Sequence, residues 1–163
     1  MSKLYTREAL VEQREAWRSA GKKVVFTNGC YDVLHPGHIR LLERARSLGD
    51  VLILALNTDA SVRRFKGPSR PFFNEEDRAE LVLRLEAVDA VVLFDEDTPR
   101  ELIAAVLPDV LVKGADWAHF IAGREEVEAA GGKVYALALE PGFSTTDIAG
   151  KALAQLSRPL SSV

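Results

Sequence analysis

Cysteine is nearly absent from this sequence of 163 residues, in which Cys30 is the single example. One cysteine excludes an internal disulfide and a zinc site built from several cysteines. Long apolar runs are absent as well, because the strongest, residues 51–56 and 90–94, are far shorter than the roughly 20 residues that span a bilayer. The first 21 residues alternate charged with isolated apolar side chains, unlike a signal peptide. We therefore expect a cytoplasmic protein that makes no membrane contact.

Neither sign of charge is in large excess. The 21 Lys and Arg residues are set against 24 Asp and Glu, which gives a net charge of −3, and no long run of either sign occurs. This balance argues against extended nucleic-acid binding, which needs a broad basic surface. Four basic residues do lie close together in the sequence: Arg63, Arg64, Lys66 and Arg70. The cluster is too short to follow a duplex but sufficient for one polyphosphate, so we expect small anionic ligands.

Three motifs of common α/β enzymes are missing: the Walker phosphate loop, the dinucleotide-binding Gly-x-Gly-x-x-Gly and the hydrolase Gly-x-Ser-x-Gly. The fold class is nevertheless α/β, because apolar runs rich in Val, Ile and Leu alternate with helix-period segments. The expected strands are 24–27, 51–56, 90–94, 110–112 and 134–139, and the expected helices are 37–48, 75–86, 99–107, 125–130 and 146–156. This alternation predicts a Rossmann-like parallel sheet with helices on both faces.

The chain has the size of one domain, residues 1–163, with one hydrophobic core. Residues 6–20 have a helical period and end at Gly21, so residues 1–22 are expected as a helical appendage. Residues 157–163 are expected as a loose tail.

The segment from His35 to His38 follows the expected strand 24–27 and opens the next helix. Ligands of parallel sheets bind beyond the carboxyl ends of the strands, which places this segment where a ligand would lie. Gly37 lets a phosphate approach the backbone without a Cβ in the way, and Pro36 suits a first helical turn. The helix start offers free N–H groups to an anion, and the two imidazoles can donate to the same phosphate.

Two other interpretations of this segment stay open. One histidine could cap the helix while the other packs, or the pair could bind a metal, although no Glu or Cys falls at ligand spacing nearby. The position between a buried strand and an amphipathic helix favours phosphate binding. Donors held this way offset the charge that builds on phosphate oxygens during phosphoryl or nucleotidyl transfer.

The sequence resembles the cytidylyltransferase-like nucleotidyltransferases, which carry a His-x-Gly-His after the first strand and a Ser-Thr-Thr near the end, here residues 144–146. The similarity is greater to the bacterial heptose 1-phosphate adenylyltransferases among them. It rests on Thr27-Asn28-Gly29, Lys66-Gly67-x-x-Arg70-Pro71, Glu96-Asp97-Thr98-Pro99 and Leu111-Val112-Lys113-Gly114, and covers nearly all of residues 1–157. The resemblance implies a flavodoxin-like Rossmann variant and transfer of AMP from ATP to D-glycero-β-D-manno-heptose 1-phosphate. It also implies Mg²⁺ held mainly by the ATP phosphates, with no metal ligands from the protein.

The resemblance further implies the site residues. His35, His38 and Lys66 are expected to be catalytic, and the nucleotide is expected to contact the two histidines together with Cys30, Tyr31, Arg70, Arg78, Gly114, Asp116, Ser144, Thr145 and Thr146. Each has a simpler alternative role. Ser144 could merely cap a helix, Lys66 and Arg70 could be solvated surface charges, and Arg78 could form a helix-surface ion pair. Asp116 could cap a turn, and Asp32 is expected to hold the loop rather than bind metal.

Two further functions are compared with this one. Cytidylyl transfer to glycerol 3-phosphate is the alternative within the class, but such relatives usually carry an Arg where this chain has residues 139–141, Leu-Glu-Pro, which favours ATP. A regulatory module that binds nucleotide without turnover would not need transition-state donors. The resemblance implies a sugar phosphate as co-substrate, a separate sugar kinase to supply it, since only 23 residues precede the expected strand 24–27, and a homo-oligomer.

Overall fold

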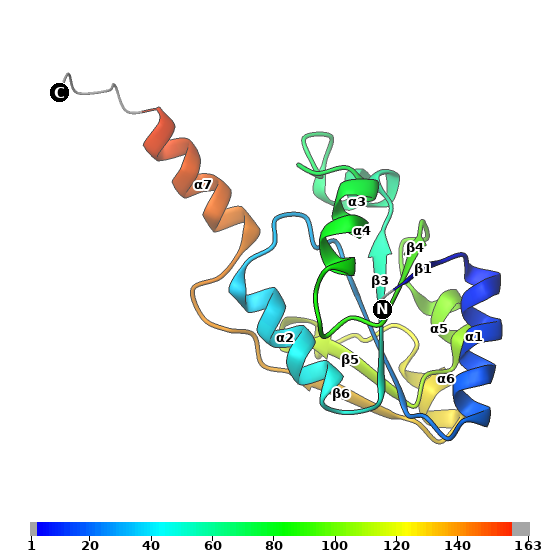
Figure 1. The fold of residues 1–163 in the computed structure, drawn as a ribbon. Coiled ribbons are helices and arrows are strands. Elements are labelled where there is room, and N and C mark those ends of the chain that lie inside the picture. The colour runs from blue at the N-terminus through cyan, green and yellow to red at the C-terminus, as the bar shows by residue number, and fades with distance from the viewer. Residues whose placement is uncertain (1–2, 158–163) are drawn as a thin grey trace.

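The apolar runs of the sequence form the central strands in the computed structural model, which describes residues 3–157 (Figure 1). The strands are β1 (Lys3–Tyr5), β2 (Val24–Gly29), β3 (Val51–Asn57), β4 (Ala90–Phe94), β5 (Val110–Gly114) and β6 (Lys133–Leu137). They form one sheet in the order β1-β4-β3-β2-β5-β6, and every neighbouring pair is parallel. The expected Rossmann-like α/β class is confirmed.

Helices cover both faces of this sheet. They are α1 (Arg7–Ser19), α2 (Pro36–Arg46), α3 (Asp59–Lys66), α4 (Glu75–Leu83), α5 (Arg100–Val106), α6 (Arg124–Ala129) and α7 (Thr145–Leu156), with a 3₁₀ turn, η1 (Ala115–Trp117). Alternate residues of the strands point to opposite faces, so Phe26 packs with α1, α5 and α6 while Val25 packs with α2 and α4. Figure 1 shows these two helical layers on either side of the strands. The continuous apolar runs follow from burial on both faces.

The helix expected over residues 6–20 forms as α1, and the N-terminal segment packs on the domain. β1 pairs with β4, from Lys3 opposite Ala90 to Tyr5 opposite Val92, and so adds an edge strand. Leu10 of α1 is fully buried in the core, and Arg14 donates to the carbonyl of Leu107 at 3.1 Å. A strand of three residues carries no readable alternation, so periodicity did not reveal it.

Lys66 lies in α3, a helix that is not among those expected from the sequence. The side chain of Thr58 caps α3 by accepting from Ser61 N at 3.2 Å, and Lys66 is the last residue of that helix. The sequence shows no apolar period here because only Ser61 and Val62 are buried. Arg70 follows in the connection to α4.

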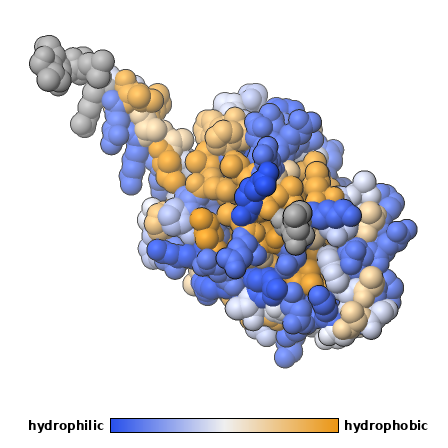
Figure 2. All heavy atoms as spheres, viewed as in Figure 1, coloured by the Kyte–Doolittle hydropathy of each residue, from blue (hydrophilic) through white to orange (hydrophobic). Residues whose placement is uncertain are grey.

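Helix α7 extends away from the sheet (Figure 1) and has no buried residue. Figure 2 shows apolar residues along it, and Leu153 and Leu156 are 68% and 85% exposed. The expected tail, residues 157–163, lies outside the described residues except for Ser157. Within residues 3–157, no helix combines the length and apolar character needed to cross a membrane.

Candidate active site

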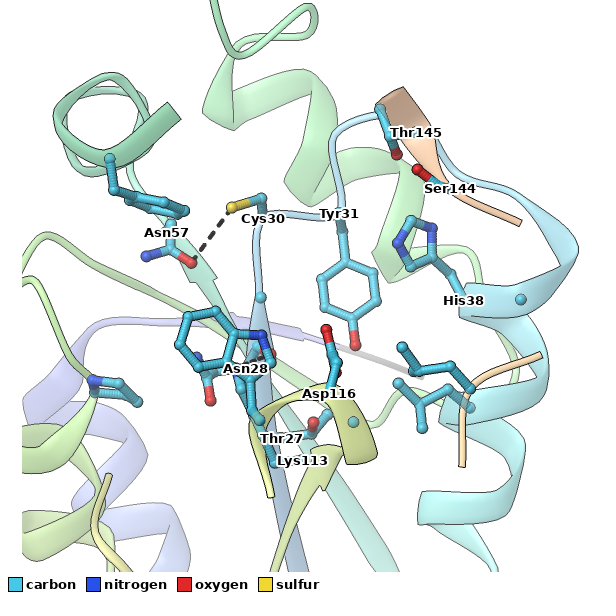
Figure 3. A pocket seen from close by; sticks show the side chains of 18 of the residues that line it. Thr27, Asn28, Cys30, Tyr31, His38, Asn57, Lys113, Asp116, Ser144 and Thr145 are labelled. Atoms are coloured by element: carbon cyan, nitrogen blue, oxygen red, sulfur yellow. Dashed lines mark hydrogen bonds between the residues drawn. The ribbon is translucent and has the colours of Figure 1, made fainter. Parts of the chain in front are cut away.

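A cavity of about 500 Å³ opens at the carboxyl ends of the strands. Its walls come from the ends of β2 to β5, from the segment after β6 and from the first turns of α2 and α7. β2 lies at its centre, between β3 and β5, where chain connections leave in opposite directions. This is the position at which parallel α/β sheets bind ligands. Figure 3 shows side chains from these separate segments pointing into the same space.

The two histidines lie at the start of α2 and their rings stack. His35 is the N-cap residue, and its Nδ1 accepts from His38 N at 3.3 Å. The ring centroids are 3.7 Å apart with an interplanar angle of 17°. His35 therefore caps α2 and also forms part of the cavity wall. Because Nδ1 accepts a hydrogen bond, we assign the proton of the neutral ring to Nε2, which leaves that N–H as a donor.

Both imidazoles are neutral at pH 7. Burial, together with the smaller effects of the nearby His35 and Lys66, lowers the pKa of His38 to about 4. Burial also lowers the pKa of His35. His38 Nδ1 is buried and lacks a hydrogen-bond partner among the described residues. The pair thus offers neutral N–H donors rather than permanent positive charge.

A second helix start enters the cavity beside the first. Ser144 caps α7, where its Oγ accepts from Asp147 N at 3.3 Å, and Thr145 Oγ1 donates to the carbonyl of Val33 at 3.2 Å. Both line the cavity, as does Thr146, and Figure 3 places Ser144 and Thr145 close to His38. The free N–H groups at the starts of α2 and α7 therefore face a common space, which is an arrangement suited to several phosphate groups.

Two lysines supply positive charge to the same cavity. Lys66 lines it from the end of α3. Lys113, at the end of β5, donates from Nζ to the carbonyl of Asn28 at 3.3 Å and lies 5.5 Å from the centroid of the Trp117 ring. Burial lowers the pKa of Lys113. Lys113 belongs to a motif of the resemblance but was not among the expected site residues, although its place directly at a strand end was an available signal.

Gly114 and Asp116 line the cavity next to Lys113. A Cβ on Gly114 would lie 2.7 Å from Asp116 Oδ1 and 2.9 Å from Leu139 Cδ2. The absence of a side chain at residue 114 therefore lets the loop after β5 and the segment after β6 approach each other. Asp116 is exposed at the cavity, where its carboxylate can accept from ligand hydroxyls.

Arg78 does not line the cavity and is instead fully buried beneath it. Its guanidinium donates to the carbonyl oxygens of Cys30 and Asn57, both at 2.8 Å. It also donates to Phe73 O at 3.0 Å and to Asp59 Oδ1 at 2.8 Å. These bonds tie the ends of β2 and β3 to the segments around α3 and α4. The geometry therefore gives Arg78 a supporting role, and its expected contact with the nucleotide stays a prediction.

Arg70 is likewise outside the cavity wall. Its Nε donates to Asp32 Oδ2 at 2.8 Å, and Asp32 also accepts from the backbone N–H groups of Phe72 and Phe73. Burial raises the pKa of Asp32, but these N–H groups and Arg70 more than offset this, so the pKa lies below its ordinary value. Asp32 thus holds the 70–73 segment, consistent with the structural role expected for it.

Cys30 and Tyr31 line the cavity after β2. Burial raises the pKa of Cys30, which keeps its side chain a thiol, and the Sγ lies 3.8 Å from Asn57 Oδ1. The buried ring of Tyr31 packs against His38 with centroids 4.9 Å apart. Three exposed aromatic residues also form part of the wall: Phe65, Trp117 and Phe120.

Known proteins match most of this chain. Residues 26–151 match the family model described as Cytidylyltransferase-like. The chain is 52% identical over 148 residues to the "Bifunctional protein HldE" of Syntrophotalea carbinolica and 53% identical over 150 residues to that of Azorhizobium caulinodans. These matches cover 90% and 91% of this chain but 30% and 31% of the relatives. The chain thus spans under a third of the length of these curated relatives.

Solved structures agree with this family. The lipopolysaccharide core biosynthesis protein from Thermoplasma volcanium is 30% identical with a TM-score of 0.60, over 74% of this chain and 98% of that protein. The pantoate-beta-alanine ligase from Francisella tularensis, complexed with beta-gamma ATP and beta-alanine, has a TM-score of 0.63 over 100% of this chain and 82% of the ligase. At 15% identity the ligase shows the shared fold alone. From the extent of the family match, this chain belongs to the cytidylyltransferase-like family of nucleotidyltransferases.

Proposed function

We propose that the chain transfers AMP from ATP to D-glycero-β-D-manno-heptose 1-phosphate, giving ADP-heptose and pyrophosphate. The observation that carries the proposal is the meeting of two helix starts, α2 with His35 and His38 and α7 with Ser144 and Thr145, in one cavity with Lys66. The name of the Thermoplasma volcanium neighbour, a lipopolysaccharide core biosynthesis protein, supports a sugar nucleotide as the product here.

The reaction needs binding and charge stabilisation more than proton transfer. A phosphate oxygen of the sugar phosphate forms a bond to the α-phosphorus of ATP while the bond from that phosphorus to pyrophosphate breaks, so no covalent enzyme intermediate forms. Negative charge builds on the α-phosphate and the leaving pyrophosphate. The N–H groups at the starts of α2 and α7 bind these oxygens, and His35 Nε2–H, His38 and Lys66 donate to them most strongly in the transition state.

The same proposal implies a position for the acceptor. The attacking oxygen approaches opposite the leaving group, so with pyrophosphate at the start of α7 we propose that the sugar phosphate lies toward Lys66. Phe65 lies on that side next to Lys66, and Phe120 is a further exposed aromatic residue of the wall. Such a wall suits a ring-shaped acceptor better than a short alcohol phosphate, which supports the sugar.

Mg²⁺ is proposed to enter with ATP, bound to its phosphates, where it would supply further charge neutralisation. Within residues 3–157, no group of three or more His, Cys, Asp or Glu side chains is placed to hold a metal ion. A cytoplasmic location, a separate sugar kinase that supplies the acceptor, and a homo-oligomer remain predictions.

One assay tests the proposal. The protein is incubated with Mg²⁺, with ATP or CTP, and with a panel of heptose, hexose and alcohol phosphates, and pyrophosphate release is measured. We expect the highest kcat/KM with ATP and heptose 1-phosphate. Faster reaction of CTP with glycerol 3-phosphate would replace the proposal with the cytidylyl alternative, and no pyrophosphate from any pair would refute nucleotidyl transfer.

A further inference from the structure

Four aromatic rings from two distant segments form a row across the phosphate-binding end of the cavity. Tyr31 packs on His38, His38 stacks on His35, and Phe143 stacks on His35 with a nearly parallel ring. The centroids of His35 and Phe143 are 5.9 Å apart with an interplanar angle of 16°. Figure 3 shows the Tyr31 and His38 part of this row beside Ser144 and Thr145. Phe143 is the one member of the row that the segment after β6 contributes.

Phe143 also lies at the contact between the two phosphate-binding segments. A Cβ on Gly37 would come within 3.0 Å of both Phe143 Cβ and His35 Nδ1, so the first turn of α2 fits closely against Phe143. Two arginines of α2 bind the segment after β6. Arg44 donates to the carbonyl of Ala138 at 2.7 Å, and Arg40 pairs with Glu140 at 3.0 Å and lies 5.8 Å from the centroid of the Phe143 ring.

The orientation of His35 depends on this packing. Its Nδ1 accepts one long hydrogen bond, 3.3 Å from His38 N, and such a bond alone leaves the ring free to tilt. Two nearly parallel neighbouring rings restrict that freedom: His38, with its centroid 3.7 Å away, and Phe143, with its centroid 5.9 Å away. The direction of Nε2–H is then set by two stacked rings rather than by a second hydrogen bond.

We propose that Phe143 is a positioning residue for nucleotidyl transfer: its ring holds the His35 imidazole so that Nε2–H is aimed at the phosphate oxygens as the Ser144–Thr146 segment contacts them. The proposal rests on the function proposed above. Phe143, which directly precedes Ser144, would then act on catalysis through His35 and would not itself contact the substrate.

Two measurements test it, one of them without substrate. In nucleotide-free protein, NMR titration reports the pKa values of His35 and His38. Burial lowers the pKa of His35, so Phe143→Ala, which removes a neighbouring ring, should raise it toward its ordinary value, whereas Phe143→Tyr should leave it low. The charged groups around the row, Lys66 of α3 and the Arg40–Glu140 pair, are unchanged in both variants.

In the turnover assay, Phe143→Ala should lower kcat by about tenfold to a hundredfold, the scale expected when a reacting group is misplaced, while KM for ATP changes by less than about threefold. Phe143→Tyr should recover most of the kcat. The matched control is Tyr135→Ala, which truncates a part-exposed aromatic on β6 outside the cavity and should leave kcat and both histidine pKa values unchanged. If Phe143→Ala does not fold, Phe143→Leu is read in the same way.

An unchanged His35 titration, or a kcat within about threefold of wild type, would overturn the role of Phe143. A rise in KM for ATP with unchanged kcat would also overturn it, because that result indicates direct binding. If the wild-type chain releases no pyrophosphate with any pair of substrates, the proposed function fails, and the titration alone then decides whether Phe143 positions His35.

Discussion

Replacing Arg78 separates a structural from a nucleotide-binding role. The buried guanidinium donates to three backbone carbonyls, of Cys30, Asn57 and Phe73, and to Asp59. Arg78→Met retains much of the apolar stem but removes every donor. A buried acceptor left without a partner costs about 1–3 kcal/mol, so three carbonyls at the lower end give a loss of about 3 kcal/mol in the free energy of unfolding. That is a large share of the roughly 5–15 kcal/mol typical of a domain.

Urea unfolding, followed by tryptophan fluorescence, measures this loss as a lower midpoint at an unchanged slope. Arg84→Met is the matched control, because Arg84 caps the same helix, is 79% exposed and pairs with Glu80 at 3.7 Å. An exposed pair of this kind contributes about 0–1 kcal/mol, so the control should unfold close to wild type. A loss below about 1 kcal/mol in Arg78→Met, together with a raised KM for ATP, would contradict the structural role and restore a direct triphosphate contact.

Three further predictions concern the cavity itself. His38→Ala should lower turnover by about a hundredfold or more, the scale for losing a positioned donor, and a variant within about threefold of wild type would refute its role. The folded state lowers the pKa of His38 from 6.5 to about 4. The unfolded chain therefore binds a proton more tightly at this position, so the free energy of unfolding should fall as the pH drops from 6.5 to 4. Denaturation of His38→Asn should show a weaker pH dependence. Gly114→Ala places a Cβ 2.7 Å from Asp116 Oδ1 and 2.9 Å from Leu139 Cδ2, and we expect a raised KM for ATP in steady-state kinetics; an unchanged KM would show that the loops separate freely.

The fold was predictable where burial of an element requires a recognisable pattern of apolar residues. Residues 90–94 form β4 with the expected bounds because the strand is covered on both faces, which requires a continuous apolar run. β1 has three residues, of which none is fully buried, so it has no such pattern. α3 buries only Ser61 and Val62, and three of its exposed residues are basic: Arg63, Arg64 and Lys66. Pairing with β4 and packing on β3 specify these elements, and such contacts are invisible to local periodicity.

The candidate site also contains residues that the sequence could predict and residues that it could not. Residues that act from a strand end or a helix start, such as His35, His38 and Ser144, were predictable because backbone geometry at those points places them in the cavity whatever their neighbours. Arg78 was not, since its partners are backbone carbonyls of residues 30, 57 and 73, and a carbonyl has no side-chain identity that a sequence can show. Phe143 reaches His35 only because α2 and the segment after β6 meet in space. Sequence therefore identifies the groups that line the cavity from strand ends and helix starts, while the residues packed against those groups become visible only in the assembled fold.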